Sequence, residues 1–177
     1  GAVAQRNVVP ILIEGLRKLE YRGYDSAGLA LLDPEGHMNR VRAVGRVAEL
    51  DTRAKEKHAD APTGIAHTRW ATHGGVNEGN AHPHISTGSD LQISVVHNGI
   101  IENFRPLREE VEAAGRELLS DTDTEVVAHV LDIDFTARLR QDPSAASDPT
   151  RVADLLVASM QAVTARLEGA FALLAVT

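Results

Sequence analysis

The sequence predicts an α+β domain in which two groups of strands lie between helices. Two observations lead to this prediction. Segments in which apolar residues recur every three or four positions alternate along the chain with short aliphatic runs, so neither an all-helical nor an all-strand protein fits the pattern. The chain has 177 residues and only 3% aromatic ones, which suits one domain whose core is built from Val, Leu, Ile and Ala.

The first sixty residues predict strands and helices in alternation. Asn7 is placed to cap a helix, and Pro10 falls in the first turn, where proline is tolerated. The run Asp33-Pro34-Glu35-Gly36 has the composition of a turn between two strands. In chain order, the expected elements are a strand at 1–3, a helix at 8–20, strands at 26–33 and 39–44, and a surface helix at 51–60.

The middle of the chain predicts a strand, a long loop and a hairpin. Residues 64–70 alternate loosely, as a half-buried strand does, and residues 72–83 are dense in Gly, Asn, His and Pro. The pair Asn98-Gly99 stands between the β-branched runs 92–97 and 100–102. Asn-Gly in this setting is the strongest short hairpin signal and favours a type I′ turn.

The last third predicts helices and one strand. Acidic residues lie in the first turn of the helix expected at 122–131, where the helix dipole favours them. The elements expected in order are helices at 106–111 and 122–131, a loop at 141–149, a helix from about residue 150 that ends at Gly169, and a buried strand at 171–176.

Composition excludes several functional classes. The formal net charge of -7 argues against nucleic-acid binding, which needs a basic surface. The chain contains no cysteine, which removes disulfides, thiolate metal sites and thiol nucleophiles together. No apolar run approaches the length of a transmembrane helix, so we expect a cytoplasmic protein without a nucleic-acid or membrane partner.

Five of the eight histidines lie between His67 and His97, which raises the possibility of a metal site. No carboxylate in this window stands at a familiar ligand spacing, and there is no helical His-Glu-x-x-His motif. We therefore expect no metal and no other cofactor. The alternative is that histidines orient loops through hydrogen bonds, which we favour for His67, His84 and His129.

Two groups of polar residues suit the chemistry of an amino acid. Arg69 follows a predicted strand and can hold a carboxylate bidentately, while Asp123 near a helix start can pair with an ammonium group. Asn98 and Gly99 offer a side-chain amide and an unobstructed backbone N–H, which could stabilise an oxyanion. Taken alone, the first pair is equally a surface ion pair or a helix cap, and the second is simply a turn.

These residues lie within five runs that resemble one family in their order and residue identities. The runs cover residues 19–28 (LEYRGYDSAG), 67–74 (HTRWATHG), 80–84 (NAHPH), 95–103 (VVHNGIIEN) and 120–125 (SDTDTE). They resemble the glutamine-hydrolysing domains of glucosamine-6-phosphate synthases, over nearly the whole chain. The resemblance implies an N-terminal-nucleophile hydrolase fold, a four-layer αββα sandwich of two antiparallel sheets between helices, with residues 1–177 as a single domain.

The resemblance also implies an activity and its partners. In the family, a cysteine at the mature N-terminus attacks the side-chain amide of L-glutamine, using its own α-amine as general base. Glutamate and ammonia are released, and the ammonia converts fructose 6-phosphate to glucosamine 6-phosphate in sugar-isomerase domains that this chain lacks. The full-length enzyme is expected to be a homo-oligomer, and L-glutamine or L-glutamate is the expected ligand.

Carried over by motif, the resemblance assigns a role to each site residue. Asn98 and Gly99 would form the oxyanion hole, and Arg22 would support the nucleophile. Arg69 would bind the glutamine α-carboxylate and Asp123 the α-ammonium. The residues expected to assist glutamine binding are Thr72, His73 and His82, with Trp70 lying over the site and controlling the passage of ammonia.

The sequence departs from the family at its start. The family begins Cys-Gly-Ile-Val-Gly, whereas Gly1-Ala2-Val3 matches the residues that come after this opening, so the nucleophile is missing from this chain. Ser26 and Thr72 are nucleophiles only by residue type, because neither has a base at a recognisable spacing. Two explanations are open: an active domain whose first residues are absent from the chain, or a module that binds glutamine without hydrolysing it. We favour the first, since the rest of the site is kept.

Overall fold

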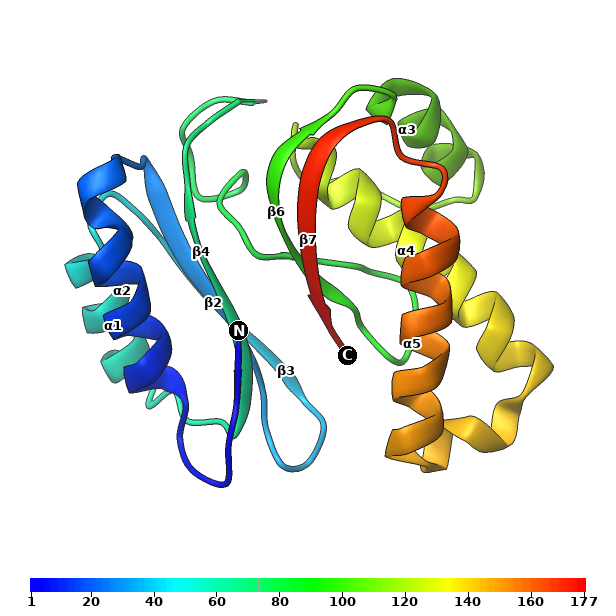
Figure 1. Ribbon diagram of the computed structural model, residues 1–177, viewed down its shortest axis with the longest axis horizontal. Helices are drawn as coiled ribbons and strands as arrows, with labels where there is room; N and C mark the ends of the chain where they lie inside the picture. Colours follow the sequence, from blue (N-terminus) through cyan, green and yellow to red (C-terminus); the bar gives the residue numbers. More distant parts are fainter. Residues whose placement is uncertain (73) are drawn as a thin grey trace.

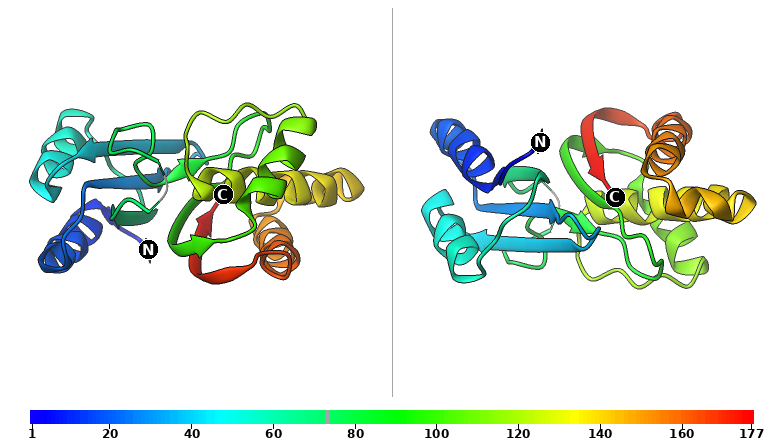
Figure 2. Two further views of the ribbon diagram at one scale, coloured as in Figure 1. Left: turned by 90° about the horizontal axis from the view of Figure 1, so that it is seen from above. Right: turned by 90° about the horizontal axis from the view of Figure 1, so that it is seen from below.

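Two sheets face each other between two layers of helices (Figure 1). The computed structural model describes residues 1–72 and 74–177. One sheet has the strand order β1-β4-β2-β3 and the other β5-β6-β7, and all of the pairs are antiparallel. Helices α1 and α2 cover the first sheet, and α3, α4 and α5 lie on the outer side of the second (Figures 1 and 2). The predicted four-layer αββα fold is therefore confirmed.

Most elements follow the expected order with shifts at their ends, but β5 and the two 3-10 turns were not expected, and the two strands expected at 92–97 and 100–102 form the single strand β6. In chain order they are β1 (Ala2–Val3), α1 (Val9–Leu19), the 3-10 turn η1 (Glu20–Arg22), β2 (Ser26–Leu32), β3 (Met38–Val44), α2 (Val47–Glu56), β4 (Thr63–Arg69), β5 (His84–Ile85), β6 (Ser94–Ile101), α3 (Phe104–Ala113), α4 (Asp123–Gln141), the 3-10 turn η2 (Pro143–Ser147), α5 (Pro149–Thr164) and β7 (Gly169–Val176).

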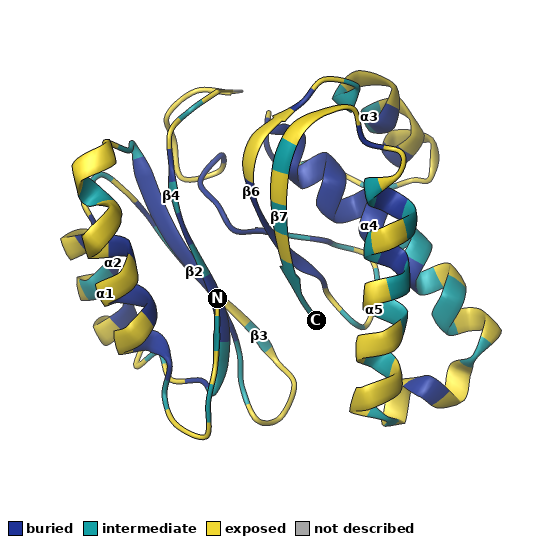
Figure 3. Cartoon of the chain, in the orientation of Figure 1, coloured by how far each residue is buried: buried dark blue, intermediate teal, exposed yellow. Residues whose placement is uncertain are grey.

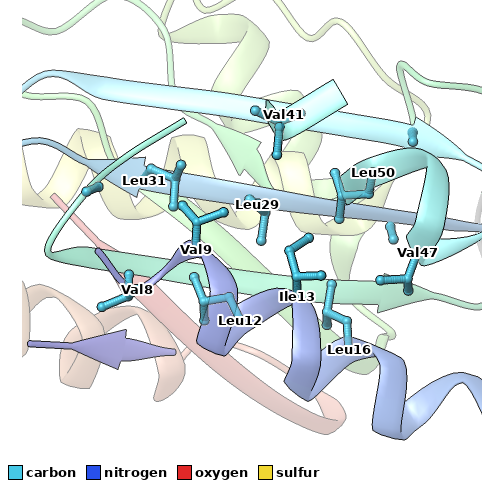
Figure 4. Packing of buried hydrophobic residues seen from close by; sticks show 14 residues of the cluster. Val8, Val9, Leu12, Ile13, Leu16, Leu29, Leu31, Val41, Val47 and Leu50 are labelled. Carbon is cyan, nitrogen blue, oxygen red and sulfur yellow. The ribbon is translucent and has the colours of Figure 1, made fainter. Parts of the chain in front are cut away.

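The first two layers are joined by an aliphatic core (Figure 4). Leu12 and Leu16, one turn apart on α1, are buried against Leu29 of β2, which is itself fully buried. Burial of each such side chain stabilises the fold by about 1.5–3 kcal/mol. Leu50 of α2 completes this core, so the apolar faces of both helices pack on the same side of the sheet.

The starts of α1 and α2 differ from the predicted ones. Asn7 accepts a hydrogen bond from the N–H of Val9 at 2.9 Å, but Val8 occupies the N-cap position. Helix α2 begins at Val47 rather than at residue 51, because the Val47 N–H donates to the hydroxyl of Tyr24 at 3.0 Å and lies 3.2 Å from the carboxylate of Glu20. This cap comes from residues more than twenty positions upstream, so no local pattern around residue 47 predicts it.

Strand β6 runs straight through the pair Asn98-Gly99, so the predicted hairpin turn is wrong. Asn98 pairs with Ala172 and Gly99 with Phe171 in an uninterrupted antiparallel ladder to β7. Gly99 has a φ of 119°, and a Cβ at this position would overlap the carbonyl oxygen of Ala170. Glycine is therefore required here for a close approach between two strands and not for a turn.

The inner faces of the two sheets meet in a small apolar layer. Ala30 of β2, Ile65 of β4 and Val96 of β6 are buried together there. Small and β-branched side chains keep this layer thin, so β4 and β6 come into direct contact. The functional residues at the ends of these two strands are brought close to one another by this contact.

The outer helices are buried to different extents (Figure 3). The first ten residues of α4, from Asp123 to Asp132, are buried on every side, because α4 packs against β6, α3 and α5. Helix α4 continues to Gln141, ten residues beyond the predicted end, and part of the predicted loop that follows is the turn η2. The final strand β7 is partly exposed rather than buried, since only β6 pairs with it.

Among residues 1–72 and 74–177, no helix is long and apolar enough to cross a membrane.

Candidate functional site

One cavity of about 630 Å³ opens where β4, β6 and the start of α4 meet. Residues of all three elements line it, together with the end of α1, the turn η1 and the loop after β4. Every described residue that the sequence proposed for the site lies on its wall: Arg22, Arg69, Trp70, Thr72, His82, Asn98, Gly99 and Asp123. His73 was also proposed and lies outside the described residues.

Arg69 places a buried positive charge on the cavity wall. It is the last residue of β4 and is only 3% exposed. Its guanidinium lies 3.5 Å from a carboxylate oxygen of Asp25 and donates to the carbonyl oxygens of Gly74 and Gly75 at 3.3 Å each. A guanidinium in a fixed position can receive a carboxylate with little loss of side-chain entropy.

Asp25 holds both Arg69 and the loop after it. One oxygen of Asp25 faces Arg69 and the other accepts a hydrogen bond from the backbone N–H of Ala71 at 2.5 Å. The backbone N–H of Asp25 in turn donates to the carbonyl of Arg69 at 2.8 Å. Sequence reasoning did not single out Asp25, although it stands in the family run at residues 19–28. Its separation of 44 residues from Arg69 hid the contact.

Asp123 places a buried carboxylate on the same cavity. It is the first residue of α4, comes directly after the N-cap residue Thr122 and is 3% exposed. One of its oxygens accepts the backbone N–H of Ile101 at 3.0 Å, which ties α4 to β6. This hydrogen bond and the position in the first turn of α4 fix the carboxylate in place. The cavity therefore carries a fixed cation from β4 and a fixed anion from α4.

The backbone N–H of Gly99 points to the same side of β6 as Asp123. In an antiparallel ladder, successive N–H groups alternate between the two sides of a strand. The N–H of Glu102 donates to the carbonyl of Glu168, on the β7 side, and the N–H of Ile101 donates to Asp123 on the other side. Gly99 is two residues from Ile101, so its N–H also points away from β7, toward the cavity that Gly99 lines.

Asn98 is connected to a buried histidine. The Nε2 atom of His67 lies 2.7 Å from the side-chain carbonyl oxygen of Asn98. Burial lowers the pKa of His67 to about 4, so the ring is neutral at neutral pH. The ring of His82 stacks on His67 with 4.3 Å between centroids, and burial also lowers the pKa of His82. His82 therefore lies on the cavity wall as a buried, neutral ring.

Of the other histidines, His84 makes the expected hydrogen bond and His129 does not. The Nε2 atom of His84 lies 3.1 Å from the hydroxyl of Thr122, which joins β5 to the start of α4. His129 lies inside α4, and neither of its ring nitrogens has a hydrogen-bond partner among the described residues. The prediction that His129 orients a loop is therefore wrong. It occupies space in the core instead.

Trp70 and Arg22 line the exposed mouth of the cavity. The indole of Trp70 is 69% exposed and lies against the backbone of Gly23. A Cβ on Gly23, which has a φ of 77°, would overlap the indole ring, so this glycine allows the ring to rest on η1. Arg22 ends η1 and is exposed, as is Thr72 in the loop after Trp70. These three side chains are free to contact a ligand that enters.

Among the described residues, no three His, Asp or Glu side chains converge in a way that could hold a metal ion. The ring of His82 contacts those of His67 and His84, and the Nε2 atoms of His67 and His84 lie beside Asn98 and Thr122. The cavity therefore presents charged side chains and hydrogen-bond donors that belong to the protein itself.

Comparison with known proteins places this chain in a family. A profile of the glutamine amidotransferase domain matches residues 41–134, more than half of the chain. The chain belongs to the glutamine amidotransferase family. The matched region contains Arg69, Asn98, Gly99 and Asp123, so both charged residues and the pair Asn98-Gly99 lie within the shared domain.

Curated relatives agree with this assignment. Glutamine–fructose-6-phosphate aminotransferases (isomerizing) from Shigella flexneri and from Escherichia coli strain K12 are each 61% identical over 131 residues. The match covers 74% of this chain and 21% of each relative. The chain thus spans about a fifth of the length of the curated relatives it matches.

Solved structures share the fold. One is the glutamine phosphoribosylpyrophosphate amidotransferase of B. subtilis, complexed with ADP and GMP, with a TM-score of 0.73 at 23% identity. The match covers 99% of this chain and 34% of the B. subtilis chain. A second structure, described as the allosteric regulatory enzyme of purine biosynthesis, has a TM-score of 0.70 at 25% identity, over 94% of this chain and 32% of its own. These likenesses extend the αββα fold over nearly the whole chain.

Proposed function

We propose that this chain supplies the glutamine-binding and oxyanion-stabilising part of a glutaminase site. The observation that carries the proposal is the single cavity in which Arg69, Asp123 and the pair Asn98-Gly99 all lie. An amino-acid zwitterion needs one cation for its carboxylate and one anion for its ammonium group, and the cavity holds both. The side-chain amide of the ligand then extends toward the donors on β6.

The chemistry that fits this arrangement is acyl transfer from a side-chain amide. A thiolate attacks the amide carbon, the carbonyl π electrons move to oxygen, and the resulting oxyanion receives hydrogen bonds from the amide of Asn98 and the N–H of Gly99. When the intermediate collapses, the C–N bond breaks, and the departing nitrogen takes up the proton that the thiol gave to the base and leaves as ammonia. Water then cleaves the thioester to glutamate and regenerates the thiol.

The strand register supports a position for the nucleophile at the start of β1. Ala2 pairs with Gly64 and Val3 with Thr63. If Cys-Gly-Ile-Val preceded Gly1, so that Gly1 stood as the last glycine of the family opening Cys-Gly-Ile-Val-Gly, and the strand kept this register, the cysteine would lie opposite Arg69, at the cavity. A cysteine at an N-terminus also carries a free α-amine with a pKa of about 7.7–8.0, which suits a general base at neutral pH.

Binding is the first test of the proposal. Titration calorimetry of the 177-residue chain with L-glutamate and L-glutamine should show saturable binding, and D-glutamate should bind at least about tenfold more weakly. Asp123→Asn removes the anion, and Arg69→Lys keeps a charge but loses the bidentate fork; each should weaken L-glutamate binding by about 1.5–3 kcal/mol. Arg108→Lys, at a half-buried side chain outside the cavity, is the matched control. Unchanged affinity in both site variants would remove the zwitterion assignment.

Turnover is the second test, and it separates an enzyme domain from a binding module. The chain as given contains no cysteine and should release no glutamate from glutamine. The same chain preceded by Cys-Gly-Ile-Val, with the cysteine as its first residue, should release glutamate and ammonia. Replacing that cysteine by serine in the extended chain should abolish the release. An extended chain that binds glutamine but does not hydrolyse it would favour a binding module over an enzyme.

The named relatives suggest the wider setting of this activity. We propose that the ammonia formed here serves the aminotransferase reaction of glutamine–fructose-6-phosphate aminotransferase, which yields glucosamine 6-phosphate in sugar-isomerase domains of a homo-oligomeric enzyme. The 61% identity with such enzymes supports this proposal. Trp70, exposed at the mouth of the cavity, is placed to guide the ammonia outward. Chromatography of a longer chain that includes isomerase domains, together with a glucosamine 6-phosphate assay, tests it.

A further inference from the structure

A buried histidine on the cavity wall determines which way the amide of Asn98 faces. The side-chain oxygen of Asn98 lies 2.7 Å from Nε2 of His67. The oxygen and the nitrogen of a planar amide point about 120° apart, so an oxygen engaged with His67 leaves the NH₂ group directed elsewhere. His67 and Asn98 both line the cavity, and Asn98 is the more exposed of the two.

The proton on the His67 ring has to be on Nε2. A buried neutral imidazole carries one N–H, and the Asn98 oxygen can only accept. A proton on Nδ1 would instead bring the lone pair of Nε2 against that of the amide oxygen at 2.7 Å, which is repulsive. Nδ1 is buried and has no hydrogen-bond partner among the described residues, although a backbone group of His97 also interacts with the ring.

The His67 ring is itself held in place. It projects from β4, where His67 pairs with Gly28 of β2, and it is 8% exposed. The ring of His82 stacks on it at an interplanar angle of 32°. A ring fixed on two sides in this way cannot swing to follow a rotating amide. The His67–Asn98 hydrogen bond therefore limits the rotation of the Asn98 side chain.

We propose that His67 is a positioning residue that fixes the Asn98 amide with its N–H group toward the reacting carbonyl, an inference that rests on the proposed glutaminase function. The opposite orientation of the amide would present an oxygen to the developing oxyanion and repel it. Preorganisation of this kind lowers the activation barrier, because the donor does not have to reorient as the charge develops. His67 does not touch the substrate in this role and acts only through Asn98.

The first experiment observes the proton directly and needs no turnover. Long-range ¹H–¹⁵N correlation spectra of the 177-residue chain at pH 7, assigned with His67→Gln, should show Nε2 of His67 protonated and Nδ1 unprotonated. A ring protonated at Nδ1, or at both nitrogens, would overturn the proposal. The outcome does not depend on whether the chain hydrolyses glutamine, so failure here is distinct from failure of the proposed function.

The second experiment uses the chain extended by Cys-Gly-Ile-Val. His67→Leu removes the donor and should lower kcat by about 30-fold, somewhat less than the 10²–10³-fold loss of a whole oxyanion donor, with KM changed by less than about twofold. His67→Gln keeps an N–H donor and should retain kcat within about threefold. The exposed His37→Gln is the matched control. Equal losses in the Leu and Gln variants, or a loss confined to KM, would contradict a positioning role.

Circular dichroism and urea unfolding of each variant ensure that only folded protein is compared. If His67→Leu does not fold, the comparison of His67→Gln with the parent chain and the spectra of the parent chain still decide the matter. If the extended parent chain has no glutaminase activity, the proposed function fails, and the proton position alone decides whether His67 orients Asn98.

Discussion

Acidification should destabilise this protein more than its exposed histidines can explain, because buried rings would have to take up protons. Burial lowers the pKa of His67 to about 4 and that of His84 to about 3, whereas an unfolded histidine titrates near 6.5. Between these values the unfolded chain binds a proton that the folded chain excludes. The stability associated with each neutral ring is therefore complete above about pH 6.5 and falls as the pH drops toward the folded pKa.

The size of the effect is set by the two pKa values of each ring. At pH 5, a histidine with a folded pKa of about 4 or 3 and an unfolded pKa of about 6.5 has lost about 2 kcal/mol of its contribution to the unfolding free energy. The two rings together therefore account for a loss of about 4 kcal/mol between pH 8 and pH 5. A domain of this size has a total stability of about 5–15 kcal/mol, so the loss should be readily measured.

Urea unfolding monitored by circular dichroism at pH 8 and pH 5 measures this loss. His84→Gln keeps an amide that can reach the hydroxyl of Thr122 but removes the titrating ring. Its stability should fall by about 2 kcal/mol less than that of the parent chain over the same pH interval. His37→Gln, at a side chain that is 75% exposed, should leave the loss of unfolding free energy between pH 8 and pH 5 almost unchanged. An equal pH-dependent loss in the parent chain and His84→Gln would refute the reasoning.

Three substitutions test the packing around the site. Leu29→Ala, in the fully buried centre of β2, should lower the unfolding free energy by about 2–5 kcal/mol in urea titrations, and a loss below about 1 kcal/mol would contradict the core described for the first sheet. Gly99→Ala should cost at least about 2 kcal/mol, because its Cβ would overlap the carbonyl of Ala170 at a φ of 119°; a stability equal to that of the parent chain would show that β6 and β7 separate easily there. Gly23→Ala should displace the indole of Trp70, the single tryptophan, and shift its fluorescence emission, and its strained backbone at a φ of 77° and a ψ of 152° should cost about 1–3 kcal/mol; an unchanged spectrum of the folded variant would mean that the ring does not rest on η1.

The largest error of the sequence reasoning concerned the strand that carries the oxyanion donors. Asn-Gly between two β-branched runs usually makes a hairpin, because both residues tolerate a positive φ. Here Asn98 and Gly99 continue β6, and Gly99 uses its positive φ and its missing side chain to lie close to β7. A dipeptide reports which backbone conformations are available. It does not report which neighbouring strand will be close.

In the second half of the molecule, the sequence pattern also did not predict how far the elements are buried. The first half of α4 is buried on all sides by β6, α3 and α5, so no polar face marks where the helix continues. Conversely, the apolar strand β7 is partly exposed because it is an edge strand. Apolar composition predicts that a segment can be buried, whereas its neighbours in space decide whether it is.

By itself, the sequence determined the layered α+β class, the family and the set of charged and amide residues expected at the site, because hydrophobic periodicity and motifs are local properties of the chain. Only the tertiary structure decided how those residues are held. Asp25 meets Arg69 across 44 positions, and His67 meets Asn98 across 31. The first contact arises because β2 pairs with β4 within one sheet, and the second because β4 and β6 of two different sheets come together; no local pattern specifies either approach.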